Sequence, residues 1–333
     1  MTHYFSKAML VLAAVSLGLG AAQPFDAAAQ DNPYRLEQGW AKYPAGRKWG
    51  STSGVDIDRA GNIWAFERCG ARDCADSKLE TIFQFDRGGN VIKSFGGDMF
   101  VFPHGMALDR DGNVYVTDAD GKNGKGHVVV KFSAQGKVLM TLGKAGVAGA
   151  TNELFNRPSA VVVAPNGDIY VADGHGGESN ARVMKFSKDG RFIKSFGKKG
   201  KGRGEFDELH AIALDSQGRV FVGDRGNGLV KIFDADGNLI DEWKQFGRPS
   251  GIYIDAADNI YVTDSQSDAK RNPGFRRGIR VGSAKDGTVR ALIPGVGPEP
   301  DKESVPEGVA ADLSGVIYGA ETSAANLLKY VRK

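Results

Sequence analysis

Cysteine is scarce in this sequence: its 333 residues include only two, Cys69 and Cys74, in the stretch "ERCGARDC". A zinc site built on this pair would normally need more Cys or His nearby. In an oxidising compartment, two cysteines this close predict a disulfide that closes a short loop. We therefore expect Cys69 and Cys74 to be bonded to each other.

An apolar run long enough to cross a membrane is also lacking. The run "AMLVLAAVSLGLGAA" at residues 8–22 is too short for a span. Lys7 precedes it and the small residues at 27–29 follow it, which is the pattern of a bacterial secretory signal peptide. We expect residues 1–29 to be such a signal, without a lipid anchor because no cysteine lies near the cleavage site. The protein should then be periplasmic or secreted.

An excess of charge of either sign is missing as well. Lys and Arg number 43 against 40 Asp and Glu, and the formal net charge is +3. The one basic stretch, "GKKGKGRGEF" at residues 197–206, is rich in glycine and is typical of a solvated loop. We expect neither a nucleic-acid partner nor a membrane span.

What the sequence does contain is a sixfold repeat. Each copy has two short alternating apolar runs joined by a polar turn, which predicts a β-hairpin. Most copies are followed by a second hairpin, so each repeat predicts four antiparallel strands. The copies are "TSGVDIDRAGNIWAFE", "PHGMALDRDGNVYVTD", "PSAVVVAPNGDIYVAD", "LHAIALDSQGRVFVGD", "PSGIYIDAADNIYVTD" and "PEGVAADLSGVIYGAE". The prediction is an all-β, six-bladed β-propeller over residues 30–333.

The sixth copy ends early, with "NLLKYVRK" as its third strand. We expect the N-terminal segment "YRLEQGWAKYP" to supply the missing outer strand, because this would close the ring and remove two exposed sheet edges.

The second residue of each copy differs between odd and even copies. The first two strands of a blade are antiparallel, so the start of the first strand and the end of the second lie at one mouth of the channel. Alternate blades of a six-fold ring lie about 120° apart, so their side chains can meet on the axis. Two imidazoles and a carboxylate suit catalytic zinc or non-haem iron. The odd copies carry Ser53, Ser159 and Ser250, and the even copies carry the candidate ligands His104, His210 and Glu307. The alternative is that these side chains only line the channel.

The residues just past the second strand should ring the same mouth. Arg68 and Arg225 occupy one register there, and His175 follows one place further on in the third copy. Arginine can hold a carboxylate with two parallel hydrogen bonds, and a histidine can transfer a proton near neutral pH. The alternative for each arginine is a salt bridge with an acidic neighbour such as Glu67 or Asp224.

The repeat pattern P-x-G-(I/V)-A-x-D-x-x-G-N-(I/V)-Y-V-x-D resembles that of the NHL repeat family, over nearly all of the chain after residue 30. "FPHGMALDRDGNVYVTD", "ELHAIALDSQGRVFVGDRGNG", "RPSAVVVAPNGDIYVADGH" and "IWAFER" further resemble motifs of the peptidyl-α-hydroxyglycine α-amidating lyases, also called peptidylamidoglycolate lyases. Those enzymes are six-bladed propellers with a central zinc held by three histidines. The resemblance implies that His104 and His210 are zinc ligands and that Arg68 and Arg225 are active-site arginines.

The chain departs from that family at three positions. The family's third zinc ligand is a histidine in Pro-His-Asp, whereas this chain has Glu307 followed by Gly308. Glu307 would then be the third ligand, and calcium is not expected because the family's Asp, which helps to hold it, is replaced by glycine. A tyrosine that acts as a base in the family aligns with His175, to which the resemblance therefore gives proton transfer.

The resulting functional hypothesis is a metal-dependent carbon–nitrogen lyase. It would use zinc, or else iron or another divalent metal, to split an N-acyl-α-hydroxyglycine or related hemiaminal into an amide and an aldehyde such as glyoxylate. Its substrate would be a small-molecule or peptide-like carboxylate, and the protein is expected to be a monomer. The alternatives are another metal-dependent propeller enzyme, such as a lactonase-type hydrolase, and a non-catalytic NHL binding module.

Overall fold

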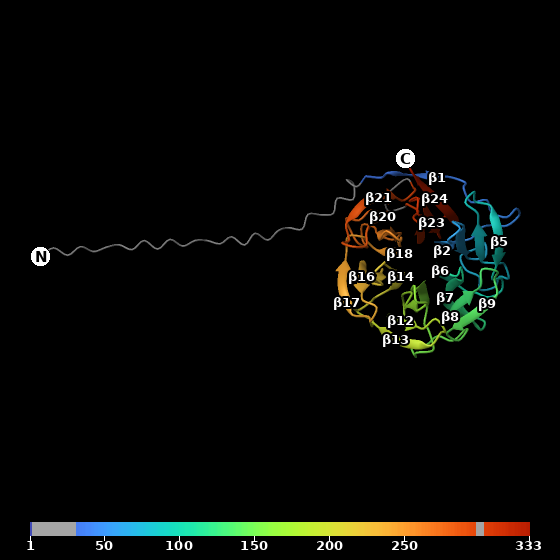
Figure 1. Ribbon diagram of the computed structural model, residues 1–333, viewed down its shortest axis with the longest axis horizontal. Coiled ribbons are helices and arrows are strands. Elements are labelled where there is room, and N and C mark those ends of the chain that lie inside the picture. Colours follow the sequence, from blue (N-terminus) through green and yellow to red (C-terminus); the bar gives the residue numbers. More distant parts are fainter. Residues whose placement is uncertain (2–30, 298–302) are drawn as a thin grey trace.

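A computed structural model describes Met1, residues 31–297 and residues 303–333, in which every regular element is a strand. The 24 strands form six four-stranded antiparallel sheets arranged as a ring (Figure 1). The predicted six-bladed propeller is therefore confirmed. In the described part of the chain, no helix is long and apolar enough to cross a membrane. The signal peptide predicted for residues 1–29 lies, except for Met1, outside the described residues.

Each of the first five blades is one uninterrupted stretch of chain, with its strands in sequence order from the axis outward. Blades one to three consist of β2 (Thr52–Ile57), β3 (Ile63–Glu67), β4 (Ile82–Phe85) and β5 (Val91–Phe95); β6 (Pro103–Leu108), β7 (Val114–Lys122), β8 (Lys125–Phe132) and β9 (Val138–Leu142); and β10 (Pro158–Val163), β11 (Ile169–Asp173), β12 (Arg182–Phe186) and β13 (Phe192–Phe196). Blades four and five consist of β14 (Leu209–Leu214), β15 (Val220–Asp224), β16 (Leu229–Phe233) and β17 (Leu239–Trp243); and β18 (Pro249–Ile254), β19 (Asn259–Asp264), β20 (Gly278–Ser283) and β21 (Val289–Pro294).

The sixth blade joins the two ends of the chain. It contains β22 (Gly308–Ala311), β23 (Ile317–Glu321) and β24 (Asn326–Arg332), and its outer strand is β1 (Tyr34–Glu37). β1 pairs with β24 in antiparallel register, so blue and red ribbons lie side by side in Figure 1. The prediction that the N-terminal segment closes the ring is confirmed.

In five of the six repeats the polar turn is built around an aspartate, whereas the third copy has Ala164 at that position. In the first blade, Oδ1 of Asp58 accepts hydrogen bonds from the backbone N–H groups of Ala60 and Asn62, at 3.0 and 2.9 Å. Gly61 between them has φ +82°, a conformation that glycine adopts without strain. Equivalent carboxylate bonds occur at Asp109, Asp215, Asp255 and Asp312. These turns set the hairpin register that determines which residue of the inner strand reaches the mouth.

The acidic residue at the last position of each aligned copy is fully buried. Asp118, for example, accepts hydrogen bonds from the backbone N–H groups of Val101 and Phe102, at 2.8 and 2.6 Å. Asp173, Asp224, Asp264 and Glu67 likewise bind N–H groups just before their own inner strands. Because a buried carboxylate needs such partners, each of these five blades fixes the chain where it enters the channel.

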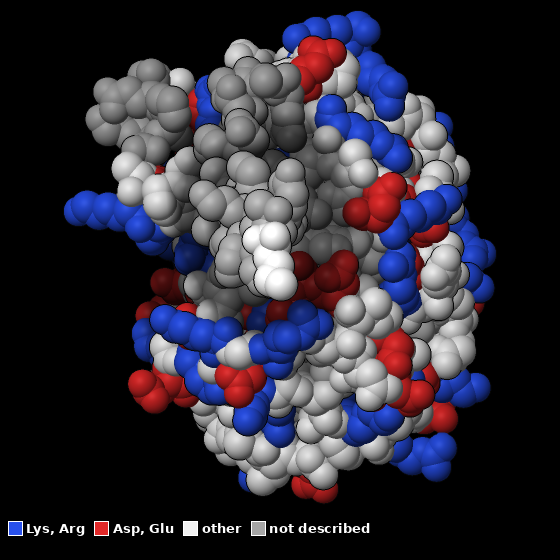
Figure 2. Space-filling model, turned by 90° about the vertical axis from the view of Figure 1, so that its left-hand side faces the viewer, with Lys and Arg blue, Asp and Glu red and all other residues white. Residues whose placement is uncertain are grey.

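Small residues allow the six inner strands to approach one another. A Cβ atom on Gly105 would lie 2.6 Å from the carbonyl oxygen of Ser159, and one on Gly308 would lie 2.5 Å from that of Ser53. Apolar side chains then fill the space between neighbouring blades, as where Trp64 and Phe66 of blade one pack with strands of blade two. On the face of the molecule that Figure 2 shows, Lys and Arg are interspersed with Asp and Glu.

Candidate metal centre

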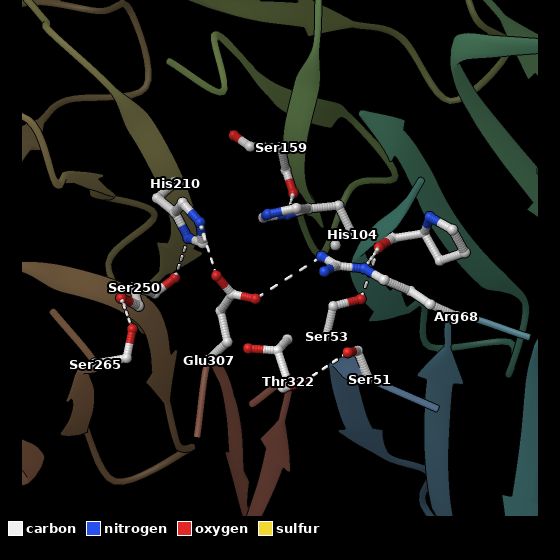
Figure 3. A network of polar contacts seen from close by, with 12 residues as sticks. Ser51, Ser53, Arg68, His104, Ser159, His210, Ser250, Ser265, Glu307 and Thr322 are labelled. Atoms are coloured by element: carbon white, nitrogen blue, oxygen red, sulfur yellow. Dashed lines mark hydrogen bonds and ion pairs between the residues drawn. The ribbon is translucent and has the colours of Figure 1, made fainter. Parts of the chain in front are cut away.

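Three side chains from alternate blades meet at one mouth of the channel (Figure 3). His104 lies in β6, His210 in β14, and Glu307 directly before β22. The ring centroids of the two histidines are 4.6 Å apart, and Nε2 of His210 lies 3.2 Å from Oε1 of Glu307. The structure thus brings together the three candidate ligands that the repeat register selected.

Both imidazoles are oriented by the neighbouring blade. Nδ1 of His104 lies 2.6 Å from the carbonyl oxygen of Ser159, and Nδ1 of His210 lies 2.6 Å from that of Ser250. A carbonyl oxygen can only accept, so Nδ1 carries the proton and Nε2 offers a lone pair. Nε2 of each ring is buried without a hydrogen-bond partner. A histidine that donates one N–H to a backbone carbonyl while its other nitrogen is free is arranged as metal-bound histidines are.

Arg68 approaches the three ligands from blade one. Its Nε donates to the carbonyl of Pro103 at 2.9 Å, and its guanidinium carbon lies 3.8 Å from the centroid of the Phe102 ring. Its Nη2 lies 3.8 Å from Oε2 of Glu307 and has no hydrogen-bond partner, although it is buried. The suggested pairing with Glu67 is wrong, because that carboxylate binds Arg47 and backbone N–H groups.

Arg225 approaches from blade four and is held by two contacts to Glu208. Nη2 and Nε lie 2.7 and 3.3 Å from the two carboxylate oxygens of that residue. Nη1 lies 3.4 Å from Oε1 of Glu307. The suggested pairing with Asp224 is wrong, because Asp224 binds Lys231 and backbone N–H groups.

His175 also reaches this cluster. Its ring centroid lies 4.3 Å from that of His104 and 5.0 Å from that of His210. One ring nitrogen from each of the three histidines lies within 4.8 Å of the other two. Among the His, Cys, Asp and Glu side chains of the described residues, these three histidines are close enough together to hold a metal ion.

Burial and nearby charges set the protonation of the cluster. Burial, followed by the neighbouring ring of His210, lowers the pKa of His104 well below its usual range. Burial and the ring of His104 do the same to the pKa of His175. Burial alone would raise the pKa of Glu307, but His210, His104 and Arg68 hold it well below its usual range. At neutral pH His104 and His175 are therefore neutral and the carboxylate of Glu307 is ionised, the states in which these groups bind metals.

A cavity of about 390 Å³ opens above the cluster. Arg68, Arg225, His175 and Glu307 contribute to its wall, so both arginines, His175 and one of the candidate ligands face a single space. Arg72 and Arg277 also line it, and give it further positive charge.

Sequence reasoning missed two residues of this mouth, Phe102 and Glu208. Phe102 packs on Arg68, and Glu208 holds Arg225. Each directly precedes the aligned copy of its blade, one position before Pro103 or Leu209. That position lies at the same mouth as the second residue of the copy, so comparing it across the repeats would have revealed both.

Below the cluster the channel narrows. A cavity of about 70 Å³ lies directly under His104, His210 and Glu307, and a larger one of about 520 Å³ opens at the opposite mouth. One apolar side chain from each blade lines both cavities and forms a ring across the channel, here called the apolar ring: Val55, Met106, Val161, Ile212, Ile252 and Val309.

Comparison with known proteins agrees with this architecture. A family profile described as "6-bladed beta-propeller" matches residues 151–267, and the NHL repeat profile matches residues 100–130. The chain is 30% identical over 308 residues to human NHL repeat-containing protein 3, which covers 90% of this chain and 84% of the human protein. The chain belongs to the NHL-repeat family of six-bladed β-propellers.

This NHL-repeat propeller is also related to amidating enzymes. It is 31% identical over 229 residues to a probable peptidyl-alpha-hydroxyglycine alpha-amidating lyase of Caenorhabditis elegans, covering 63% of this chain and 62% of that protein. It is 28% identical over 318 residues to peptidyl-glycine alpha-amidating monooxygenase B of Xenopus laevis, and this alignment spans 85% of this chain but only 34% of the relative. The expected resemblance to the lyases is therefore confirmed.

Solved structures share the fold of this NHL-repeat propeller at low sequence identity. A gluconolactonase from Xanthomonas campestris superposes with a TM-score of 0.59 at 15% identity, covering 86% of this chain and 88% of that one. A virginiamycin B lyase from Staphylococcus aureus superposes with a TM-score of 0.56 at 15% identity, covering 89% and 88%. At this identity the likeness concerns architecture alone.

Proposed function

We propose that this propeller is a metal-dependent lyase that cleaves the carbon–nitrogen bond of an N-acyl-α-hydroxyglycine or a related hemiaminal. The observation that carries the proposal is the pair of buried Nε2 atoms on His104 and His210, which have no hydrogen-bond partner and lie beside Glu307 and two arginines. The related amidating lyase supports the reaction class.

The residues of the mouth fit a divalent metal ion. Two nitrogen donors oriented by backbone carbonyls, with a carboxylate 3.2 Å from one of them, suit zinc, and iron is the alternative. The third protein ligand would come from the side chains beside them, for which the sequence favours Glu307. When bound, such an ion supplies a Lewis acid that makes a nearby substrate hydroxyl more acidic. Calcium is not proposed, because Gly308 has no side chain and a Cβ atom there would meet a backbone oxygen at 2.5 Å.

The arginines would bind and orient the substrate. Arg68 has a buried Nη2 with no hydrogen-bond partner, and this atom can donate to the substrate carboxylate. Glu208 fixes the guanidinium of Arg225, which adds a second positive charge on the other side of Glu307. A substrate carboxylate held between these groups would place the adjacent carbon above the histidines.

The reaction then needs one proton to move. The substrate hydroxyl gives up its proton, its oxygen forms the carbonyl of the aldehyde, and the electron pair of the carbon–nitrogen bond passes to nitrogen. That nitrogen takes a proton and leaves as the amide. A ring nitrogen of His175 or a carboxylate oxygen of Glu307 lies close enough to the cluster to receive the proton.

A lactonase-type hydrolase is the second candidate, supported by the shared architecture with the gluconolactonase. It ranks lower because several carboxylates and amides would be expected around a lactonase metal, whereas this mouth is rich in His and Arg. A non-catalytic binding module is the third candidate.

The deciding experiment incubates zinc-loaded protein with α-hydroxyhippurate and measures glyoxylate. We expect glyoxylate and benzamide in equal amounts, and at least a tenfold lower kcat/KM in the Arg68→Ala variant. Arg203→Ala, which removes a largely exposed arginine outside this cavity, is the control and should retain activity. Turnover of a simple lactone without glyoxylate release would overturn the lyase proposal, and turnover of neither would favour the binding module.

A further inference from the structure

His175 lies in the turn after β11, and its imidazole packs against the candidate metal centre. It lies two positions beyond Asp173, which ends β11, and its backbone N–H donates to the carbonyl of Arg157 at 2.9 Å. Gly176, next to it, has φ +68°, and the N–H of this glycine bonds the carbonyl of Gly174 at 2.9 Å. This tight turn directs the imidazole inward.

The ring of His175 packs against three other rings. Its centroid is 4.3 Å from that of His104, 5.0 Å from that of His210 and 5.9 Å from that of Phe102. Among the described residues, no side-chain hydrogen bond to the imidazole of His175 is formed. A partly buried imidazole without a partner, next to two buried Nε2 atoms that also lack one, leaves three nitrogen donors around one point.

The spacing of those donors is close to that of a metal site. One nitrogen from each ring lies within 4.8 Å of the others. Nitrogen ligands about 2.0–2.1 Å from a tetrahedral zinc lie roughly 3.4 Å apart, so the rings would need to close in by little more than an ångström.

Glu307, by contrast, already has positive partners on both oxygens. Oε1 lies 3.4 Å from Nη1 of Arg225, and Oε2 lies 3.8 Å from Nη2 of Arg68. If Glu307 turned toward a metal ion, the two largely buried guanidiniums would lose the negative charge that balances them. A buried unpaired charge is costly.

We infer that His104, His175 and His210 together bind the metal ion, with one imidazole from each of three consecutive blades, and that Glu307 is the counter-charge of Arg68 and Arg225 beside it. This inference rests on the proposed metal centre and concerns its third ligand. Three imidazoles with an open fourth position form a catalytic zinc site. In that arrangement the fourth position would be left to a group that approaches from the cavity, whose wall also includes Arg68.

The assignment predicts an order of metal affinities. Zinc dissociation constants are measured by competition with a chromophoric chelator for the wild-type protein and for His175→Ala, Glu307→Gln and His127→Asn. His127 is the remaining histidine of the described chain and lies outside the group, so it is the matched control. We expect His175→Ala to raise the zinc dissociation constant by about 100-fold or more. Glu307→Gln should raise it by a factor at least ten times smaller, and His127→Asn should leave it unchanged.

The opposite order, with Glu307→Gln losing zinc and His175→Ala retaining it, would overturn the assignment. Unchanged affinity in both His104→Ala and His210→Ala would instead reject the metal centre itself. X-ray absorption of the zinc-loaded wild type needs no variant and decides the question even if His175→Ala does not fold. Three imidazoles per zinc are expected, and two with a carboxylate would refute the inference.

Discussion

Nε2 of His210 lies 3.2 Å from Oε1 of Glu307, so an imidazole of blade four and a carboxylate of blade six face each other across the channel axis. The same carboxylate lies between Arg68 and Arg225. Its negative charge therefore reduces the repulsion between the two guanidiniums, each of which is less than a tenth exposed.

Removing that carboxylate should destabilise the metal-free protein. We expect Glu307→Ala to lower the free energy of unfolding by about 1–3 kcal/mol at pH 7, because buried charges lose their partner. The measurement is urea denaturation in the presence of a chelator. Acetate or glyoxylate at millimolar concentration should restore part of the loss by binding between the arginines. Equal stability of variant and wild type would show that the two guanidiniums do not depend on Glu307.

Glu208 should matter for substrate binding rather than for metal binding. We expect Glu208→Gln to raise the KM for a carboxylate-bearing substrate about tenfold, because Arg225 loses its two charged contacts. Zinc content should stay unchanged, which separates this effect from damage to the histidines. Arg203→Ala, a largely exposed cation on the neighbouring loop, is a control that should leave KM unchanged.

The ion pair between Glu208 and Arg225 also predicts how the stability of the protein depends on pH. Burial alone would raise the pKa of Glu208, but the hydrogen bonds and charge of Arg225 lower it to about 2. The folded state therefore binds this proton less tightly than the unfolded state, so the stabilisation is present above about pH 4.3 and is lost as the pH falls toward 2. The stability difference between wild type and Glu208→Gln, about 1–3 kcal/mol at pH 6, should shrink steadily between pH 4.5 and 2.5. A difference that does not vary over this range would contradict the pairing.

The disulfide between Cys69 and Cys74 follows Arg68 directly, and both cysteines are buried against Phe66 and Phe100. Replacing both cysteines by serine should lower the free energy of unfolding by about 2 kcal/mol, the entropy expected for so short a loop. The KM for the substrate should rise several-fold, because Arg68 is then less firmly held. Wild-type protein treated with reductant should behave like the variant, and equal stability with and without reductant would count against the prediction.

The closing strand β1 gives a further test. A chain that begins at residue 38 lacks β1 and exposes the backbone edge of β24. Unpaired edges associate, so we expect a loss of at least about 2 kcal/mol in unfolding free energy and concentration-dependent oligomers in size-exclusion chromatography. A chain that begins at residue 31 is the control and should be monomeric. If the shorter chain stays monomeric with unchanged stability, β1 is dispensable.

Periodicity determined most of what could be predicted from the sequence. The alternation of Ser and ligand-type residues at one register, from Ser53 to Glu307, depends only on strand order and hairpin register, and turn residues such as Asp58 specify both. The disulfide was predictable from the spacing of its cysteines, and the structure confirms it.

The partners of long side chains were not predictable in the same way. Glu67 and Asp224 are adjacent in sequence to Arg68 and Arg225, but their carboxylates turn into the blade to satisfy backbone N–H groups. The arginines consequently find Glu307 and, for Arg225, Glu208 instead. The direction of the His175 ring depends on the backbone of the turn from Gly174 to Gly177, and the repeat pattern does not encode it because the sequences of the corresponding turns differ from blade to blade.

The apolar ring places one apolar side chain from each blade between the histidines and the opposite mouth. A charged substrate of the proposed reaction would have to shed its water to pass that ring, which is costly. We therefore expect the substrate to enter, and both products to leave, through the mouth that carries Arg68 and Arg225. A long acyl chain would then extend outward over the rim of that mouth, and the terminal group of a larger molecule would be the part that reaches the histidines.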